Sequence, residues 1–206
     1  MNQHVHIPRL PLDQQMTVRE FLAFTETRPD NERWELIEGA AVLNASPTDF
    51  HQIVVANITT FLMNERRRLG ASWRPMPGVG TIVPVSPNSL PQPDVLVKAG
   101  MPTGCHTTDD ALVIFEVLSR SNAKADREWR RRVYGSVPNC QHYVTVTLGR
   151  IEVVVHDRSA DWVPQTLGEK GEVLLLSCLG VTMPLEAIYQ DVVVGAATSR
   201  KGSRKR

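Results

Sequence analysis

The chain has 206 residues, 42% of them hydrophobic and 22% charged, which is ordinary for a single soluble globular domain. Its formal net charge of +1 excludes a surface that is basic throughout and binds polyanions generally. No stretch approaches the roughly 18 uninterrupted apolar residues of a membrane span, and three isolated cysteines argue against a disulfide scaffold or a zinc ribbon, so we expect a cytoplasmic protein without a membrane partner.

The N-terminal part of the chain is expected to be irregular and then to form a short helix and a hairpin. Residues 1–15 contain prolines and show no helical period, which predicts an irregular arm. Thr17 and Glu20 have the spacing of a capping box and predict the start of a short helix. Residues 34–43 are typical of a hairpin that turns near Gly39.

The rest of the chain alternates between helical and strand-like patterns. Residues 50–69 have one mostly apolar face and an arginine-rich last turn, which predicts a long helix, and Asn122 can cap a second helix that ends near Gly135. A last helical turn is expected at 184–189. Runs rich in β-branched and aliphatic residues predict strands at 80–85, 94–97, 112–118, 143–147, 151–156, 162–167 and 173–176. These patterns predict one α/β domain over residues 1–198.

Two carboxylates stand within predicted buried strands. Asp94 opens one apolar run, and Glu116 interrupts another. An ionised carboxylate in such a strand is unfavourable unless it is paired or binds a metal, and two at neighbouring strand ends suit a hard divalent cation. Two alternatives stay open, because Asp94 could be a solvated turn residue and Glu116 could form a structural ion pair.

Three side chains on the second long helix share one face. Asp126, Arg130 and Tyr134 are four residues apart, so they line the same side of the helix, which can fold back toward the carboxylates. There Arg130 could stabilise charge that develops on a phosphate. The alternative is a surface salt bridge between Asp126 and Arg130, with Tyr134 half buried in the core.

The last eight residues, 199–206, differ in charge from the rest of the chain. They carry five basic residues and no acidic one, which leaves 18 basic and 22 acidic residues elsewhere. Such a tail can bind phosphate backbones loosely, or it can be a solvated, disordered end. We expect a disordered basic tail.

Several short motifs appear together in a fixed order. They are Glu35-Leu36-Ile37-Glu38-Gly39, His51-Gln52, Pro93-Asp94-Val95, Glu116-Val117-Leu118-Ser119, Asp126-x-x-x-Arg130-x-x-x-Tyr134 and Gln141-His142-Tyr143. With them the chain resembles the Uma-type endonuclease family of the PD-(D/E)XK nuclease superfamily over roughly residues 17–192. The resemblance implies a restriction-endonuclease-like fold, which is a mixed β-sheet flanked by α-helices.

The resemblance also implies an active site. Asp94 matches the motif aspartate of the superfamily, and Glu116 matches its acidic partner. Leu118 stands where the superfamily has a lysine, which this family commonly moves to the following helix, at the position of Arg130. Arginine keeps the positive charge but cannot act as a base. Mg²⁺ or Mn²⁺ would be bound by Asp94, Glu116 and the backbone carbonyl of Val117.

Three further residues match positions of the family. Glu35 could bind the metal through water or orient a ligand, and His51 could hydrogen-bond the substrate or transfer a proton. For His51 a structural hydrogen bond at the start of a helix is the alternative. Gln141 stands where the family commonly has an acidic residue and is given a supporting role, as are Asp126 and Tyr134.

Two classes of function follow from these patterns. The first is a metal-dependent endonuclease that hydrolyses DNA phosphodiester bonds. The second is a catalytically weakened protein of the same fold that binds nucleic acid or another protein, because Arg130 replaces the usual lysine. We expect DNA and a second copy of the chain, in a homodimer, as its partners.

Overall fold

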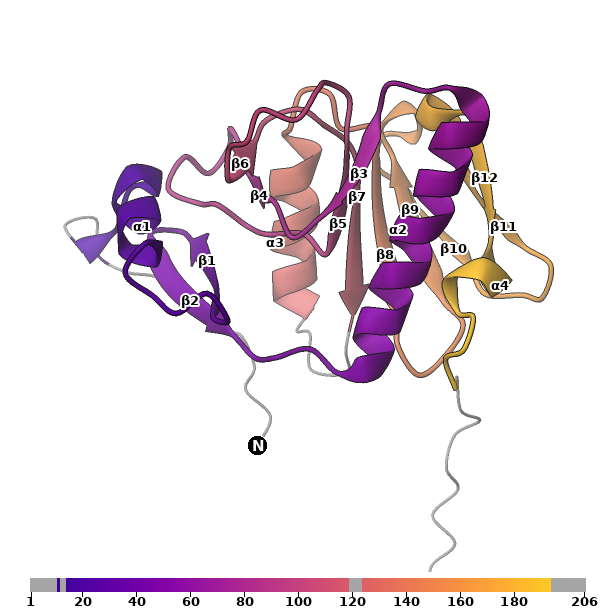
Figure 1. The fold of residues 1–206 in the computed structure, drawn as a ribbon, viewed down its shortest axis with the longest axis horizontal. Coiled ribbons are helices and arrows are strands. Elements are labelled where there is room, and N and C mark those ends of the chain that lie inside the picture. Colours follow the sequence, from indigo (N-terminus) through magenta and orange to yellow (C-terminus); the bar gives the residue numbers. More distant parts are fainter. Residues whose placement is uncertain (1–10, 12–13, 119–123, 194–206) are drawn as a thin grey trace, which may run out of the picture.

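A six-stranded mixed sheet forms the centre of the protein in the computed structural model, which describes residue 11, residues 14–118 and residues 124–193 (Figure 1). Its strand order is β10-β9-β8-β7-β5-β3. The strands are β3 (Arg74–Pro77), β5 (Val95–Lys98), β7 (Ala111–Leu118), β8 (His142–Thr147), β9 (Val153–Asp157) and β10 (Pro164–Leu167). Only β7 and β8 run parallel in this sheet, and α3 (Lys124–Gly135) connects them. The predicted mixed sheet is therefore confirmed.

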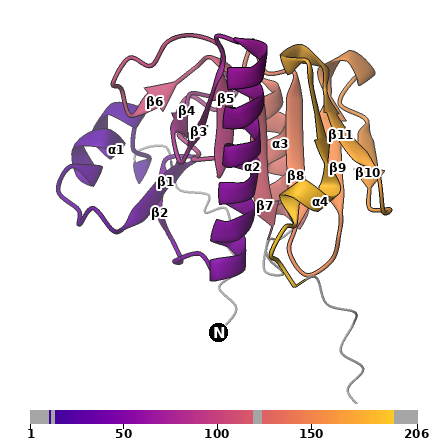
Figure 2. The ribbon, with the colours of Figure 1, turned by 45° about the vertical axis from the view of Figure 1, so that its right-hand side comes forward.

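Two long helices cover opposite faces of the sheet (Figure 2). On one face, α2 (Asp49–Leu69) buries Val54, Ile58 and Leu62 against the sheet. On the other, α3 packs its own apolar side chains against the strands. Because side chains alternate along a strand, the residues of β7 divide between these two cores. Phe115 faces α2, Ile114 faces α3, and Glu116 takes the α3 side.

A small N-terminal unit lies beside the sheet (Figure 1). It consists of α1 (Val18–Thr25) and the antiparallel pair β1 (Arg33–Ile37) and β2 (Ala40–Asn44). The predicted capping box of Thr17 and Glu20 is present. The predicted hairpin turns at Glu38 and Gly39, which both have positive φ values.

The C-terminal part packs against the α2 face. The hairpin of β11 (Val173–Leu176) and β12 (Val181–Pro184) leads into α4 (Leu185–Ile188), and both contribute to the core around α2. Short 3-10 turns lie at η2 (Arg158–Ala160) and η3 (Ser177–Leu179). Among the described residues, no helix is long and apolar enough to cross a membrane.

The strand prediction at 80–85 needs a correction, and β3, β12 and the short strand at 107–108 were not predicted. The strand expected at 80–85 is only β4 (Gly80–Thr81), which pairs with β6 (Thr107–Thr108), because Pro84 cannot donate to a longer ladder. β3 was not predicted because two of its four residues are prolines, which are tolerated here since β3 lies at the sheet edge. The expected cap at Asn122 and the basic tail at 199–206 fall outside the described residues.

Candidate active site

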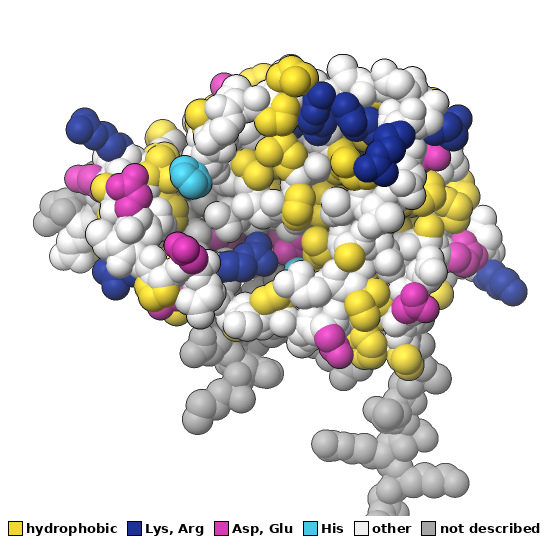
Figure 3. Space-filling model, in the orientation of Figure 1, with side chains coloured by type: hydrophobic (Ala, Val, Ile, Leu, Met, Phe, Trp, Pro, Cys, Tyr) yellow, Lys and Arg dark blue, Asp and Glu magenta, His cyan; other side chains and the backbone are white. Residues whose placement is uncertain are grey.

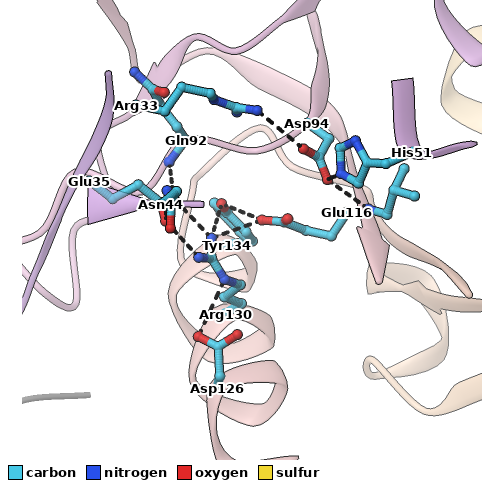
Figure 4. A network of polar contacts seen from close by, with 11 residues as sticks. Arg33, Glu35, Asn44, His51, Gln92, Asp94, Glu116, Asp126, Arg130 and Tyr134 are labelled. Atoms are coloured by element: carbon cyan, nitrogen blue, oxygen red, sulfur yellow. Dashed lines mark hydrogen bonds and ion pairs between the residues drawn. The ribbon is translucent and has the colours of Figure 1, made fainter. Parts of the chain in front are cut away.

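Asp94 is fixed at the point where β5 begins. Its carboxylate is buried, with 9% of the residue exposed, and Oδ2 accepts a hydrogen bond of 2.8 Å from the backbone N–H of Val117. Val117 lies on the neighbouring strand β7, where it directly follows Glu116. This bond brings the two expected metal ligands to one place, and Asp94 is not the solvated turn residue of the alternative interpretation (Figure 4).

Glu116 is joined to α3 by two hydrogen bonds to one of its oxygens. Arg130 donates to Oε1 over 3.0 Å, and the hydroxyl of Tyr134 donates to the same atom over 2.8 Å. The alternation of β7 explains this arrangement, because it turns Glu116 toward the helix. The ion pair considered from the sequence therefore exists, and among the described residues its hydrogen bonds reach only Oε1 of Glu116.

Arg130 stands between three carboxylates. Its guanidinium donates to both oxygens of Glu35 over 3.1 and 2.8 Å and reaches Glu116, while its Nε lies 3.4 Å from Asp126 Oδ1. Asp126 is 3% exposed and Arg130 8% exposed. The contact between them is thus buried, and the alternative of a surface salt bridge is wrong. Tyr134 is fully buried rather than half buried.

Glu35 comes from the N-terminal unit and is the best satisfied of these carboxylates. Besides Arg130, it accepts hydrogen bonds from Asn44 Nδ2 and from the backbone N–H of Gln92. Burial alone would favour the neutral acid, but the charge of Arg130 and these hydrogen bonds outweigh burial and hold the pKa of Glu35 below its ordinary value. Glu35 is therefore an ionised partner of Arg130.

Glu116 has the opposite electrostatic balance. Burial raises its pKa, Asp94 and Glu35 add like charge, and Arg130 and Tyr134 offset only part of this, so that the pKa of Glu116 reaches about 8. Arg130 divides its donors unequally, with two hydrogen bonds to Glu35 and one to Glu116. Burial opposes the charge of Arg130 as well, but its carboxylate partners keep the pKa of Arg130 well above its ordinary value. Glu116 is therefore a buried carboxyl whose negative charge Arg130 compensates only in part.

His51 approaches the site from the first turn of α2. Its Nε2 lies 3.3 Å from Asp94 Oδ2, and its Nδ1 is buried without a hydrogen-bond partner among the described residues. The backbone N–H of His51 is capped by Thr48. The structural hydrogen bond considered for His51 is thus present in the backbone, while its side chain lies against Asp94 (Figure 4).

Gln141 does not join this group. In the pairing of β7 with β8, His142 stands opposite Val113 and Thr145 stands opposite Glu116. Gln141 therefore lies at the far end of the strand pair, where its amide donates to the carbonyl of Asn139. The supporting role predicted for Gln141 has no basis in its position.

Three residues of the site were missed from the sequence. Arg33 approaches Asp94 Oδ1 to 4.0 Å, and Asn44 and Gln92 hold Glu35. Arg33 could have been found, because residues two apart on a strand share a face and Arg33 precedes Glu35 by two. Asn44 lies on the strand paired with that of Glu35 in the same hairpin, whereas Gln92 is 57 residues away from Glu35 and carries no local signal.

Comparisons with known proteins agree with this architecture. A family model named Uma2 and described as "Putative restriction endonuclease" matches residues 18–186. None of the curated proteins compared with the chain matches it. Among solved structures, a putative nuclease of the DUF820 family from Anabaena variabilis is similar with a TM-score of 0.68 and 12% identity. The match covers 84% of this chain and 97% of the other, and at that identity it shows the fold alone.

Proposed function

The chain belongs to the Uma2 family of putative restriction endonucleases, and from that premise we propose that it is a metal-dependent nuclease that hydrolyses DNA phosphodiester bonds. The observation that carries the proposal is the 2.8 Å bond from the Val117 N–H to Asp94 Oδ2. It fixes the Asp94 carboxylate next to Glu116, at one end of the paired strands β5 and β7. Two carboxylates at one strand end can hold a hard cation.

The residues present fit a divalent cation. Glu116 is buried beside the carboxylates of Asp94 and Glu35, and its pKa is raised. A cation would therefore complete the compensation of its negative charge. The Val117 N–H is turned toward Asp94, and its carbonyl faces the same side because both groups of a strand residue point to one neighbour. Asp94, Glu116 and the Val117 carbonyl would hold Mg²⁺ or Mn²⁺.

This set is smaller than a closed protein cage. Within the described ranges, no group of three or more His, Cys, Asp or Glu side chains could hold a metal. Mg²⁺ is commonly held by one or two carboxylates, with waters and substrate phosphate completing its shell, so two carboxylates and a carbonyl suffice. When bound, the cation would activate water and neutralise charge on the scissile phosphate.

The chain's own residues would orient the site and handle protons. Arg130 holds the Glu116 and Glu35 carboxylates in place, and it cannot serve as a base because its pKa lies far above neutrality. His51 Nε2, 3.3 Å from Asp94 Oδ2, is placed to accept or return a proton beside this carboxylate. Asp126 supports Arg130, and Tyr134 orients Glu116.

A second function is favoured by the position of Arg130. Its guanidinium already occupies Glu116 Oε1 and both oxygens of Glu35. A fixed internal cation of this kind competes with a metal for the same carboxylates. The alternative is therefore a catalytically weakened nuclease fold that binds nucleic acid or a protein.

Cleavage of DNA by matched variants separates the two functions. The protein is incubated with supercoiled, linear and single-stranded DNA in Mg²⁺, in Mn²⁺ and in EDTA. An enzyme requires metal, loses about a hundredfold or more of its rate in Glu116→Gln, and retains or gains rate in Arg130→Lys. Asp109→Asn, an exposed acid outside the site, is the control and should cleave as the wild type does.

The outcomes are distinct. An inert wild type together with an active Arg130→Lys variant identifies a weakened nuclease whose carboxylates are intact. If neither protein cleaves any substrate, hydrolysis is the wrong function. Cleavage that persists in Glu116→Gln places the active site elsewhere.

The remaining expectations belong to the same proposal. Residues 1–198 would form one domain with a basic tail at 199–206, and two copies would pair because each chain supplies one Asp94–Glu116 site for one strand of a duplex. Light scattering with and without DNA tests the homodimer. A monomer on cleavable duplex DNA would contradict it.

A further inference from the structure

A small pocket adjoins Asp94. It has a volume of about 130 Å³ and is lined by Arg33 of β1, by His51, Gln52 and Val55 of α2, by Pro77 and Gly78, and by Asp94. Glu116 is not part of this lining. The pocket therefore shares Asp94, but not Glu116, with the proposed metal ligands.

Arg33 contributes a cation whose donors are available. Its guanidinium lies 4.0 Å from Asp94 Oδ1, which is beyond hydrogen-bond distance, and its side chain is 36% exposed. To the residues that the structure describes, this guanidinium makes no hydrogen bond. Figure 4 shows the side chain extended from β1 toward Asp94. Arg130 differs, because its donors are already engaged with buried carboxylates.

The other walls leave room for a polar group. Gln52 is exposed in the first turns of α2 and can donate from its amide. Gly78 has a positive φ, and a Cβ added there would meet nothing within 4 Å, so the pocket is open beside it. Figure 3 shows basic and acidic side chains together in the hollow between the α1–β1–β2 unit and the rest of the molecule. A planar guanidinium beside an open pocket suits a phosphate, which it can bind with two parallel hydrogen bonds.

We propose that this pocket, defined by Arg33, Gln52 and Gly78, binds the DNA backbone phosphate next to the one that is cleaved. Arg33 is its main ligand. The inference rests on the proposed function, because the scissile phosphate is assigned to Asp94 and Glu116. A phosphate in the pocket would hold the strand beside Asp94 without displacing either carboxylate. Arg33 thus sets the register of the DNA strand by binding its phosphate backbone, independently of base sequence.

The test removes the charge of one DNA phosphate and the charge of Arg33, separately and together. A set of otherwise identical oligonucleotides carries one uncharged methylphosphonate linkage at successive positions, and binding is measured by fluorescence anisotropy in Ca²⁺ and in EDTA. For the wild type, one position should weaken binding by about tenfold, because it removes a hydrogen-bonded charge pair. Arg33→Gln should bind all-phosphate DNA about tenfold more weakly and should be insensitive at that position.

Matched variants exclude a general loss of charge or fold. Arg33→Lys should recover part of the affinity, since it keeps the charge but not the two-pronged geometry. Arg68→Gln makes the same charge change at the far end of α2, about 24 Å from Gln52 along a helix that rises about 1.5 Å per residue. It should keep the wild-type sensitivity at every linkage. All variants should have the wild-type circular dichroism spectrum.

The inference and the proposed function can fail separately. If Arg33→Gln and the wild type respond equally to every linkage, the pocket is not a phosphate site, whatever the cleavage assay shows. If Arg33→Gln alone loses the sensitivity to one methylphosphonate linkage but no DNA is cleaved, the phosphate site is supported and the proposed hydrolysis is wrong. Absence of DNA binding by the wild type at low salt overturns both.

Discussion

The two ends of β5 carry polar clusters of opposite character. At the Lys98 end, the ammonium donates to Thr108 over 3.1 Å and lies 3.7 Å from Asp110. Asp110 also accepts from the N–H of Gly100 and the amide of Asn139, so one cation faces one well-satisfied carboxylate. At the Asp94 end, several buried carboxylates share the buried guanidinium of Arg130. These carboxylates are Glu35, Glu116 and Asp126, and Asp94 is a fourth buried carboxylate beside them.

The difference separates a structural cluster from a functional one. A balanced pair such as Lys98 and Asp110 stabilises the strand end and needs no further ligand. An excess of buried carboxylates is unfavourable in the free protein unless a proton, a metal or a substrate group compensates for it. Burial raises the pKa of Glu116, and the like charges of Asp94 and Glu35 raise it further. A buried cluster with unbalanced charge is therefore the place to expect chemistry.

The largest expected effect is on metal binding. Asp94→Asn should weaken Mn²⁺ binding by about a hundredfold or more, because losing even a residue that supports a ligand costs about 10- to 100-fold. Isothermal titration calorimetry measures it. Asp110→Asn removes a carboxylate from the balanced end and should leave the affinity unchanged. Equal losses in both variants would show that the two ends do not differ as argued.

The next effect concerns stability. Arg130→Met leaves Glu35 and Glu116 buried without their shared cation and should lower the free energy of unfolding by about 3–5 kcal/mol. Lys98→Met should cost only about 1 kcal/mol, because the Asp110 side chain is one-quarter exposed and keeps two other donors. Urea denaturation in EDTA gives both values. A larger loss from Lys98→Met would contradict the comparison.

A smaller effect appears in the pH dependence of the metal-free protein. The folded pKa of Glu116 is about 8, above its ordinary 4.5, so the folded state holds more protons than the unfolded state between these values. Stability should therefore fall as the pH rises from about 4.5 to about 8. Glu116→Gln should flatten this decline, as denaturation curves at several pH values would show.

Glu35 gives the control of opposite sign. Its folded pKa lies below the ordinary value, so its contribution to stability is present at neutral pH and is lost as the pH falls below about 4.5. Glu35→Gln should remove that acid-side loss and leave the decline toward pH 8 in place. If the stability of Glu35→Gln and Glu116→Gln depended on pH in the same way, Arg130 would compensate the two carboxylates equally, which contradicts the comparison.

Local patterns were sufficient to predict the parts of the site that lie on single elements. The apolar runs around Asp94 and Glu116 predicted buried strands, because they are rich in β-branched and aliphatic residues. The spacing of Asp126, Arg130 and Tyr134 predicted one helical face. These elements are confirmed, whereas the chemical roles given to their residues stay predictions.

Contacts between distant segments explain what the sequence did not reveal. The burial of Arg130 depends on Glu35, which lies 95 residues away in the sequence. Without that contact, Asp126 and Arg130 could be interpreted as a surface salt bridge. The two prolines in residues 74–77 argue against a strand in the sequence. The strand β3 can form because it lies at the edge of the sheet. Gln141 lies one residue before β8, but strand register places it away from Glu116.

The smallest expected effect comes from the tail at 199–206. Its composition is polar and basic with no apolar period, so its deletion should change the melting temperature little, because it can bury little apolar surface. The tail carries five positive charges, and any that contact phosphates release counterions. Deletion should therefore weaken DNA binding and flatten its salt dependence, in contrast to Arg33→Gln, which also changes the response to one linkage. Anisotropy titrations over a salt series measure both. An unchanged salt slope would assign DNA binding to residues 1–198 alone.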